Sequence, residues 1–186
     1  MSKILLASAL LSITLIFQAC SSNEEETQTT NAMVSTNEYV LTGLDKAQYI
    51  TTQTETGFKV KDNESKIIIF DIFATWCPPC QAEATHLTSL QEKYKDDLLI
   101  LGVSVEDGIS NSKLETFKSE HNAQYPLVNS SENRRLIGAV AKKLNIGRNF
   151  GIPLMALYKD GKLINFYQGA TEEEFIESDI KRALGK

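Results

Sequence analysis

Two nearly continuous apolar runs dominate the hydrophobic pattern of this chain. They cover Lys66 to Phe73 and Leu98 to Val105, and apolar runs without alternation are typical of strands buried on both faces of a sheet. The segment between them, from about Pro78 to Tyr94, has apolar side chains at helical spacing and predicts a helix. The order strand, helix, strand indicates an α/β protein.

Shorter segments with turn signals come before this unit. Residues 38–43 have the composition of a strand, and residues 49–52 and 58–60 are expected to pair as a hairpin. Polar residues and a glycine between the last two segments supply the turn. An N-terminal β-hairpin extension is therefore expected to lead into the buried strands.

The second half of the chain alternates helices and strands. Ser112 with Glu115 and Thr171 with Glu174 have capping-box spacing, and Asp160-Gly161 is a hairpin turn signal. This order predicts a mixed central sheet with helices on both faces. The predicted elements are a helix over 111–122, a strand over 125–128, a helix over 132–144 with Gly147 just past its end, strands over 154–158 and 163–167, and a helix over about 171–184.

The bulk composition fits one globular domain with an appendage. The chain has 186 residues, of which 42% are hydrophobic, enough to bury a core. Its net charge is −5 and it contains no basic run, and both features argue against a nucleic-acid partner. Three cysteines are too few for a disulfide scaffold, so the pair Cys77 and Cys80 is expected to do chemistry.

The N-terminus has the pattern of a signal peptide. Lys3 precedes an apolar stretch from Ile4 to Phe17, which is short for a membrane span of roughly 20 residues. We predict a signal peptide over residues 1–19. Ala19-Cys20 resembles the lipobox of bacterial lipoproteins, which implies that Cys20 carries a lipid. Plain secretion with an incidental cysteine and an uncleaved anchor stay open.

Residues 20–37 are expected to form a flexible tether. The stretch from Ser21 to Asn31 has no hydrophobic side chain that could offset the entropy lost on ordering. Such a tether would hold a folded domain over residues 38–186 away from a membrane surface.

The strongest candidate for chemistry is Trp76-Cys77-Pro78-Pro79-Cys80, between the first buried strand and the first helix. Two cysteines separated by two residues at a strand-to-helix junction can close into a small disulfide ring. Free backbone N–H groups at a helix start favour a thiolate at the first sulfur, and a thiolate is the attacking species in disulfide exchange. Prolines are tolerated in a first helical turn. This stretch therefore predicts a redox centre.

These features together resemble the thioredoxin superfamily, and more narrowly the TlpA/ResA-type envelope thiol-disulfide oxidoreductases. The resemblance covers roughly residues 38–186. It rests on the segment from Phe73 to Cys80 after an apolar strand, on Phe150-Gly151-Ile152-Pro153 before a hairpin strand, and on the strand-helix segment over about residues 107–147. It implies a thioredoxin fold with an N-terminal hairpin extension and a central strand-helix insertion.

The resemblance also implies roles for the residues of the motif. Cys77 would be the exposed nucleophile that attacks a partner disulfide, and Cys80 would be the resolving thiol that breaks the mixed disulfide. Trp76, Pro78 and Pro79 would contact the partner. A Trp76 that serves only in packing is the alternative.

Three further residues follow from the resemblance. Ile152 and Pro153 match the family's cis-proline site, where a cis bond would turn the Ile152 backbone toward the cysteines. Asp71 lies six positions before Cys77 on the buried strand, and burial should raise the pKa of its carboxyl. An aspartate at this place in thioredoxins accepts the proton of the resolving cysteine, here Cys80. A buried carboxyl without a kinetic role is the alternative.

The expected function is reduction of disulfides in exported proteins, such as apocytochrome c, on the periplasmic side of a bacterial envelope. A membrane electron donor would recycle the dithiol, and the redox-active disulfide would be the only cofactor. We expect a lipid-anchored monomer. We expect no metal, because His86 and His121 lack the spacing of metal ligands. The alternatives are a thiol oxidase or isomerase, a peroxiredoxin-type peroxidase, whose proline-threonine-cysteine loop is absent, and a binding module with a static disulfide.

Overall fold

The computed structural model describes residues 37–186 of the chain. The predicted signal peptide, the predicted lipid site at Cys20 and nearly all of the predicted tether lie outside the described residues, so they remain predictions. No helix within the described range is long and apolar enough to cross a membrane.

A five-stranded mixed sheet forms the centre of the domain. β4 (Ile67–Phe73) pairs in parallel with β5 (Leu98–Ser104), which pairs in parallel with β6 (Leu127–Val128). On the other side of β4, β7 (Leu154–Lys159) and β8 (Lys162–Gln168) complete the order β6-β5-β4-β7-β8 in antiparallel pairing. Every residue of β4 and β5 is buried, as the two uninterrupted apolar runs predict.

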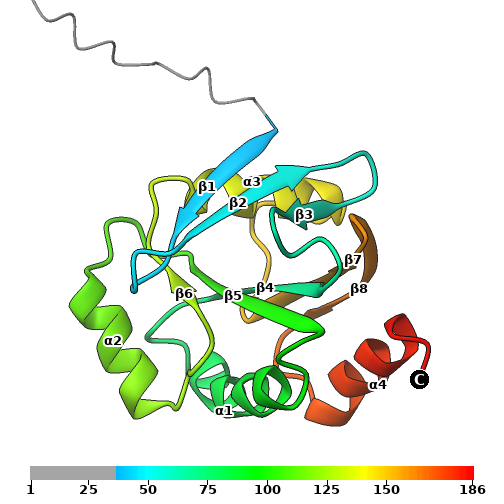
Figure 1. Ribbon diagram of the computed structural model, residues 1–186. Coiled ribbons are helices and arrows are strands. Elements are labelled where there is room, and N and C mark those ends of the chain that lie inside the picture. The colour runs from blue at the N-terminus through cyan, green and yellow to red at the C-terminus, as the bar shows by residue number, and fades with distance from the viewer. Residues whose placement is uncertain (1–36) are drawn as a thin grey trace, which may run out of the picture. The chain divides into compact units, whose positions relative to one another are not determined.

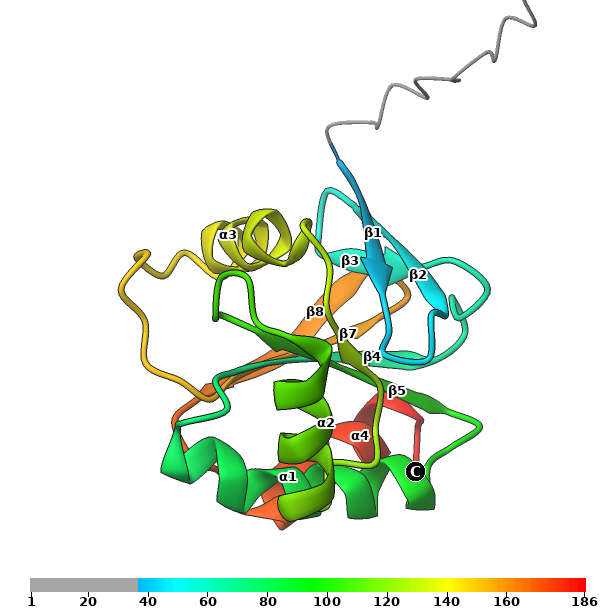
Figure 2. The ribbon, with the colours of Figure 1, turned by 90° about the vertical axis from the view of Figure 1, so that its left-hand side faces the viewer.

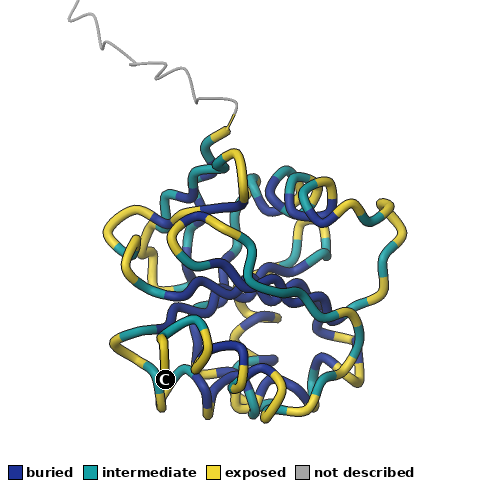
Figure 3. Tube along the Cα trace, turned by 90° about the vertical axis from the view of Figure 1, so that its right-hand side faces the viewer, coloured by how far each residue is buried: buried dark blue, intermediate teal, exposed yellow. Residues whose placement is uncertain are grey.

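Both faces of this sheet are covered. α1 (Pro78–Lys93), α2 (Asn111–Glu120) and α4 (Glu173–Ala183) lie on one face, below the sheet in Figure 1, and α3 (Asn133–Lys143) lies on the other. The turned view in Figure 2 shows the same two layers. In Figure 3 the buried strands form a dark band between more exposed outer layers. The predicted mixed sheet with helices on both faces is confirmed.

The N-terminal extension is larger than the predicted hairpin. β1 (Glu38–Thr42), β2 (Gln48–Gln53) and β3 (Phe58–Val60) form an antiparallel three-stranded sheet that packs on the same side as α3. The ring of Phe58 packs edge-on against Phe70 of β4 and Tyr158 of β7, with centroids 5.7 and 5.3 Å apart. The strand predicted over 38–43 belongs to this sheet because the turn after β1 returns the chain along it.

Two predicted helix caps are wrong. Ser110 caps α2, since its side chain accepts a hydrogen bond from the Lys113 N–H at 3.2 Å, and Ser112 lies inside the helix. α4 has no side-chain cap bond. The backbone N–H of Thr171 instead donates to Glu83 of α1 at 3.1 Å, so a tertiary contact replaces the predicted local one.

Two predicted turns have different outcomes. The β7–β8 hairpin turns at Asp160-Gly161, as predicted, and both residues have positive φ (53° and 77°), as a type I′ turn requires. After α3, Asn145 takes the left-handed conformation with φ 54°. Gly147 is therefore not needed to end this helix.

Candidate active site

Cys77 occupies the N-cap position of α1, where the chain leaves the central strand. Its backbone is extended (φ −88°, ψ 108°), and its Sγ accepts a hydrogen bond from the backbone N–H of Cys80 at 3.4 Å. The two sulfurs form a disulfide, with Cα atoms 5.3 Å apart. The local spacing thus builds a disulfide ring at the start of the helix, as the motif predicts.

The two prolines limit the donors available to the first sulfur. Pro78 and Pro79 occupy the first two positions of α1 and have no backbone N–H. An N-cap side chain ordinarily accepts from the second or third helical N–H, so only the Cys80 N–H is left. The expected set of several N–H donors at Cys77 is therefore reduced to one donor and the helix dipole.

A second segment of the site comes from the residues before β7. The Ile152–Pro153 bond is cis, as the resemblance implies. The carbonyl oxygen of Ile152 lies 3.8 Å from Cys77 Sγ, although the two residues are 75 positions apart in the chain. Pro153 is buried, and Ile152 is half-buried beside the disulfide. The fold therefore brings the cysteine pair and the cis-proline segment together.

Cys77 is less accessible than predicted. Only 3% of Cys77 and 3% of Cys80 is exposed, so the expected exposed nucleophile is wrong for the disulfide form. Both sulfurs belong to the apolar cluster between α1 and the sheet. Trp76 is 63% exposed, which argues against a role only in packing, and Pro78 and Pro79 are also exposed. A partner would meet these three side chains before it met the sulfurs.

A carboxylate holds the segment before Cys77 in place. Glu106, just after β5, accepts hydrogen bonds from the N–H and the Oγ1 of Thr75 at 2.7 and 2.8 Å. Its other oxygen binds Lys113 of α2 at 2.5 Å. Burial alone would raise the pKa of Glu106, but these partners together hold it below the usual value. The side chain of Gln81 also donates to the Thr75 carbonyl, at 2.7 Å.

Asp71 lies on β4 with its side chain toward α1. Ile69 and Phe73, its neighbours at two-residue spacing, belong to the same apolar cluster as the disulfide. Asp71 is 3% exposed, and its Oδ2 accepts a hydrogen bond from the hydroxyl of Tyr125 at 2.8 Å. Burial raises the pKa of Asp71 to about 7, and the bond from Tyr125 partly opposes this rise. The predicted direction of the shift is confirmed.

A second buried carboxyl, which the sequence pattern did not single out, lies on α1. Glu83 is 3% exposed, and its Oε2 has no hydrogen-bond partner among the described residues. Burial, followed by the negative charge of Asp71, raises the pKa of Glu83 to about 8, against the effect of the Thr171 N–H. The sequence did contain a signal for Glu83, which lies three positions after Cys80. Residues three apart lie on the same face of a helix.

The two carboxyls form a pair that titrates near neutral pH. Because burial raises both pKa values and the charge of Asp71 further disfavours ionisation of Glu83, the pair of Asp71 and Glu83 can hold or accept a proton around pH 7. Such a pair on the buried side of a disulfide is suited to general acid-base work. Within residues 37–186, no cluster of His, Cys, Asp and Glu side chains is arranged to hold a metal ion.

The sequence of this chain is similar to those of known thiol-disulfide oxidoreductases. The AhpC/TSA family matches residues 44–170. The thiol-disulfide oxidoreductase ResA of Bacillus thuringiensis subsp. konkukian is 23% identical over 145 residues, which cover 75% of this chain and 77% of ResA.

Solved structures show the same fold. A thioredoxin-family thiol:disulfide interchange protein from Chlorobium tepidum TLS superposes with a TM-score of 0.63 and 20% identity over 80% of this chain and 94% of that one. An exposed lipoprotein thioredoxin, Etrx1, from Streptococcus pneumoniae gives a TM-score of 0.56 and 19% identity over 78% of this chain and 98% of that one. The expected thioredoxin fold is confirmed.

Proposed function

We propose that this chain, which belongs to the AhpC/TSA family, reduces disulfides of exported proteins. It is a TlpA/ResA-like thiol-disulfide oxidoreductase of the thioredoxin superfamily. The observation that carries this proposal is the Cys77–Cys80 disulfide beside the Ile152 carbonyl. This arrangement supplies two sulfurs at one helix start and a backbone edge on which an extended partner can lie. The dithiol is the working form, and no other cofactor takes part.

The reaction consists of two thiol-disulfide exchanges. The thiolate of Cys77 attacks a client disulfide, forms an S–S bond with one client sulfur and releases the other as a thiolate. Cys80 then transfers its proton to the pair of Asp71 and Glu83 and attacks the sulfur of Cys77. The second client sulfur leaves, so the client gains two electrons and the Cys77–Cys80 disulfide forms again.

The surroundings of the sulfurs favour the reducing direction. A strongly oxidising pair has a well-stabilised thiolate in its reduced form. Here Pro78 and Pro79 leave one N–H donor to Cys77, and two carboxyls lie on the buried side of the site. A weakly stabilised thiolate makes the dithiol a stronger reductant, whereas an oxidase would require the opposite.

The reduction potential tests this direction. We expect the Cys77–Cys80 pair to lie below about −200 mV, whereas an oxidant would lie near −120 mV. Pro79→Ala restores an N–H at the second position of α1, from which it can donate to Cys77 Sγ. It should lower the pKa of Cys77 and raise the potential by about 10 to 30 mV, because one pKa unit corresponds to about 30 mV for a two-electron couple. Equilibration with glutathione buffers measures the potential.

Pro78→Ala is the matched control for this measurement. Its N–H would occupy the first position of α1, from which donation to the N-cap side chain is not expected. Equal shifts in the two variants would count against the role of the N–H donors. A wild-type potential near −120 mV would overturn the reducing direction itself.

We further propose that apocytochrome c is among the clients and that a membrane electron donor recycles the disulfide. A Cys80→Ser variant keeps the attacking sulfur of Cys77 but lacks the resolving thiol, so it should accumulate a mixed disulfide with its client. Cys77→Ser is the control and should capture nothing. Mass spectrometry identifies the captured protein, and capture of no exported cysteine-containing protein would contradict the assignment of the client class.

The proposed location is the periplasmic side of a bacterial envelope, with a lipid on Cys20 as the anchor and residues 20–37 as the tether. The likeness to an exposed lipoprotein thioredoxin supports this location. A palmitate analogue should label the wild-type protein and fail to label Cys20→Ala. Labelling of both proteins alike would remove Cys20 as the lipid site.

A further inference from the structure

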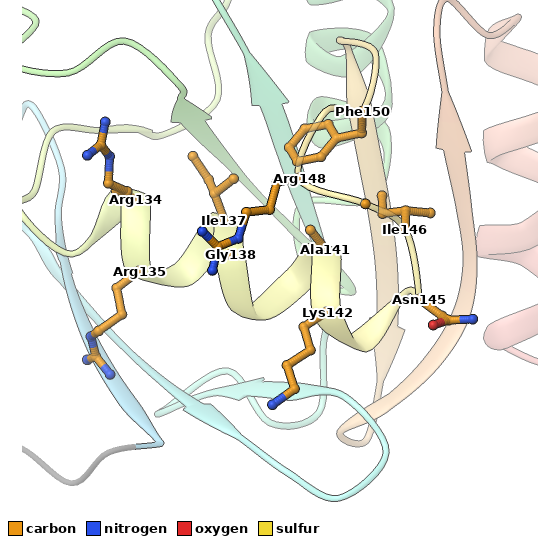
Figure 4. A pocket seen from close by; sticks show the side chains of 11 residues that line it. Arg134, Arg135, Ile137, Gly138, Ala141, Lys142, Asn145, Ile146, Arg148 and Phe150 are labelled. Atoms are coloured by element: carbon orange, nitrogen blue, oxygen red, sulfur yellow. The ribbon is translucent and has the colours of Figure 1, made fainter.

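A large pocket lies between α3 and the connection that leads from α3 to the cis-proline segment. Its volume is about 970 Å³, and Figure 4 shows its side chains on both walls. Ile137, Ile146 and Phe150 are half-buried and supply apolar surface, while Lys142 and Arg148 are exposed. The pocket therefore combines an apolar lining with cations, as sites for amphipathic ligands do.

The charge of this region is opposite to that of the chain. No acidic residue occurs between Glu132 and Asp160, although the whole chain has a net charge of −5. Arg134 is paired with Asp107. The side chains of Lys142 and Arg148, by contrast, form no hydrogen bond or ion pair with any residue of the described range. Two cations at the pocket therefore lack a counter-charge within the described domain, and an anionic ligand would supply one.

Two glycines keep the pocket open without being required by the backbone. Gly138, within α3, and Gly147 both line it, neither has positive φ, and a Cβ added to either would meet no atom within 4 Å. A glycine within a helix is destabilising relative to alanine, so α3 would be more stable with a side chain at Gly138. Space for a ligand is a reason to omit that side chain.

The pocket and the redox site share one segment of the chain, residues 148–152. Phe150 lines it and is followed by Gly151 and by Ile152, whose carbonyl lies 3.8 Å from Cys77 Sγ. From Arg148 to Ile152 the chain advances four residues, at most about 14 Å when extended. An extended polypeptide bound beside Ile152 could therefore place a side chain in the pocket while its cysteine meets Cys77.

We propose that this pocket binds an acidic segment of the client polypeptide, about four to six residues from the cysteine that Cys77 attacks. This inference rests on the proposed function and adds the client's charge to it. The ion pairs would form with Lys142 and Arg148, and apolar side chains next to the acidic ones would contact Ile137 and Phe150. A concave, partly apolar pocket fits a peptide better than it fits an anionic membrane surface. Binding to an anionic membrane is the competing outcome in the experiment below.

Two disulfide-containing peptides test the proposal, identical except for Glu-Glu or Gln-Gln placed about five residues from the attacked cysteine. We expect the full-length protein to reduce the Glu-Glu peptide with a kcat/KM about three- to tenfold higher, a preference that weakens with added salt. Labelled cysteine-free versions measure binding without the chemistry. In the Lys142→Gln/Arg148→Gln variant both preferences should fall to about onefold.

Two further variants separate charge from space. Gly138→Leu keeps every charge but adds a bulky side chain to the lining of the pocket, and it should weaken the preference for the acidic peptide. Lys61→Gln/Lys95→Gln changes the charge equally at exposed lysines outside the pocket and should keep the preference. Thermal unfolding checks that each variant is folded.

Each outcome decides the proposal. Equal binding of the two cysteine-free peptides to the wild type, or a preference retained in Lys142→Gln/Arg148→Gln, would overturn it. It would also be overturned if that variant lost binding to phosphatidylglycerol vesicles while keeping its peptide preference, because the cations would then face a membrane. Preferential binding of the acidic peptide without reduction of either disulfide peptide would support the pocket and contradict the proposed function.

Discussion

The Asp71→Asn/Glu83→Gln variant is expected to release a client from Cys77 about 10- to 100-fold more slowly than the wild type at pH 7. The slow step would be the attack by Cys80, which must first lose its proton. In the wild type a carboxylate of the buried pair accepts that proton, and in the variant neither amide can do so. The first exchange, at Cys77, should change much less.

The pH dependence gives this effect a direction. Burial raises the pKa of Asp71 to about 7 and that of Glu83 to about 8. Below these values the carboxyls hold protons and cannot accept another, so the wild-type release rate should rise as the pH increases through about 7 to 8. The variant should lose this inflection, and its rate should follow only the ionisation of the Cys80 thiol.

Release of thionitrobenzoate from a mixed disulfide with Cys77 measures the second step directly in stopped flow. Glu115→Gln is the matched control, because Glu115 is an exposed carboxylate of α2 away from the disulfide. The single variants Asp71→Asn and Glu83→Gln show how the two carboxyls share the role. A release rate and a pH profile identical to those of the wild type would leave the pair with a structural role only.

The same carboxyls should make the stability of the oxidised protein fall as the pH rises. Their pKa values in the folded protein, about 7 for Asp71 and about 8 for Glu83, are above the ordinary values of 3.8 and 4.5. The folded state therefore binds more protons than the unfolded state between about pH 4 and pH 8. Each carboxyl lowers the free energy of unfolding by up to about 1.4 kcal/mol per pH unit in that range. The stabilising contribution of the protonated carboxyls is fully present below their ordinary pKa values. It is lost as the pH rises above their pKa values in the folded protein.

Asp71→Asn removes one of these contributions. We expect the variant to gain about 2 to 4 kcal/mol of unfolding free energy relative to the wild type between pH 4 and pH 8. Urea unfolding at the two pH values measures the difference. Glu106 and Glu177 have pKa values lowered from 4.5, so they act in the opposite direction below about pH 4.5. The comparison is therefore between variant and wild type at each pH. A difference that does not change with pH would mean that Asp71 is ionised in the folded protein.

Most of the fold could be predicted because its signals are local. The buried strands β4 and β5 are uninterrupted apolar runs, and the turn at Asp160-Gly161 needs only two residues. The predicted cap of α4 is wrong because of a long-range contact, since the Thr171 N–H donates to Glu83, 88 residues away. The predicted cap of α2 is wrong by two residues, since Ser110 takes that role. The strand over 38–43 was predicted, but its pairing with β2 was not, because that pairing depends on a turn that has no strong signal.

Local spacing was also sufficient for the redox pair, because three residues of helix geometry bring Cys77 and Cys80 into one ring. The cis bond before Pro153 could be expected only through the family resemblance, since X-Pro bonds are mostly trans. Burial of Cys77 and the pocket beside α3 had no local signal, because each depends on segments far apart in the chain.

The residues that can react are thus set by short-range order, and their reactivity is set by long-range packing. A spacing of three positions is preserved in any helix, so the chain sequence was enough to identify the sulfurs. A pKa depends on what surrounds a group, and Tyr125, 54 positions from Asp71, meets it only in the folded domain. For that reason the acid pair, the accessibility of the sulfurs and the basic pocket became visible only once the chain was folded.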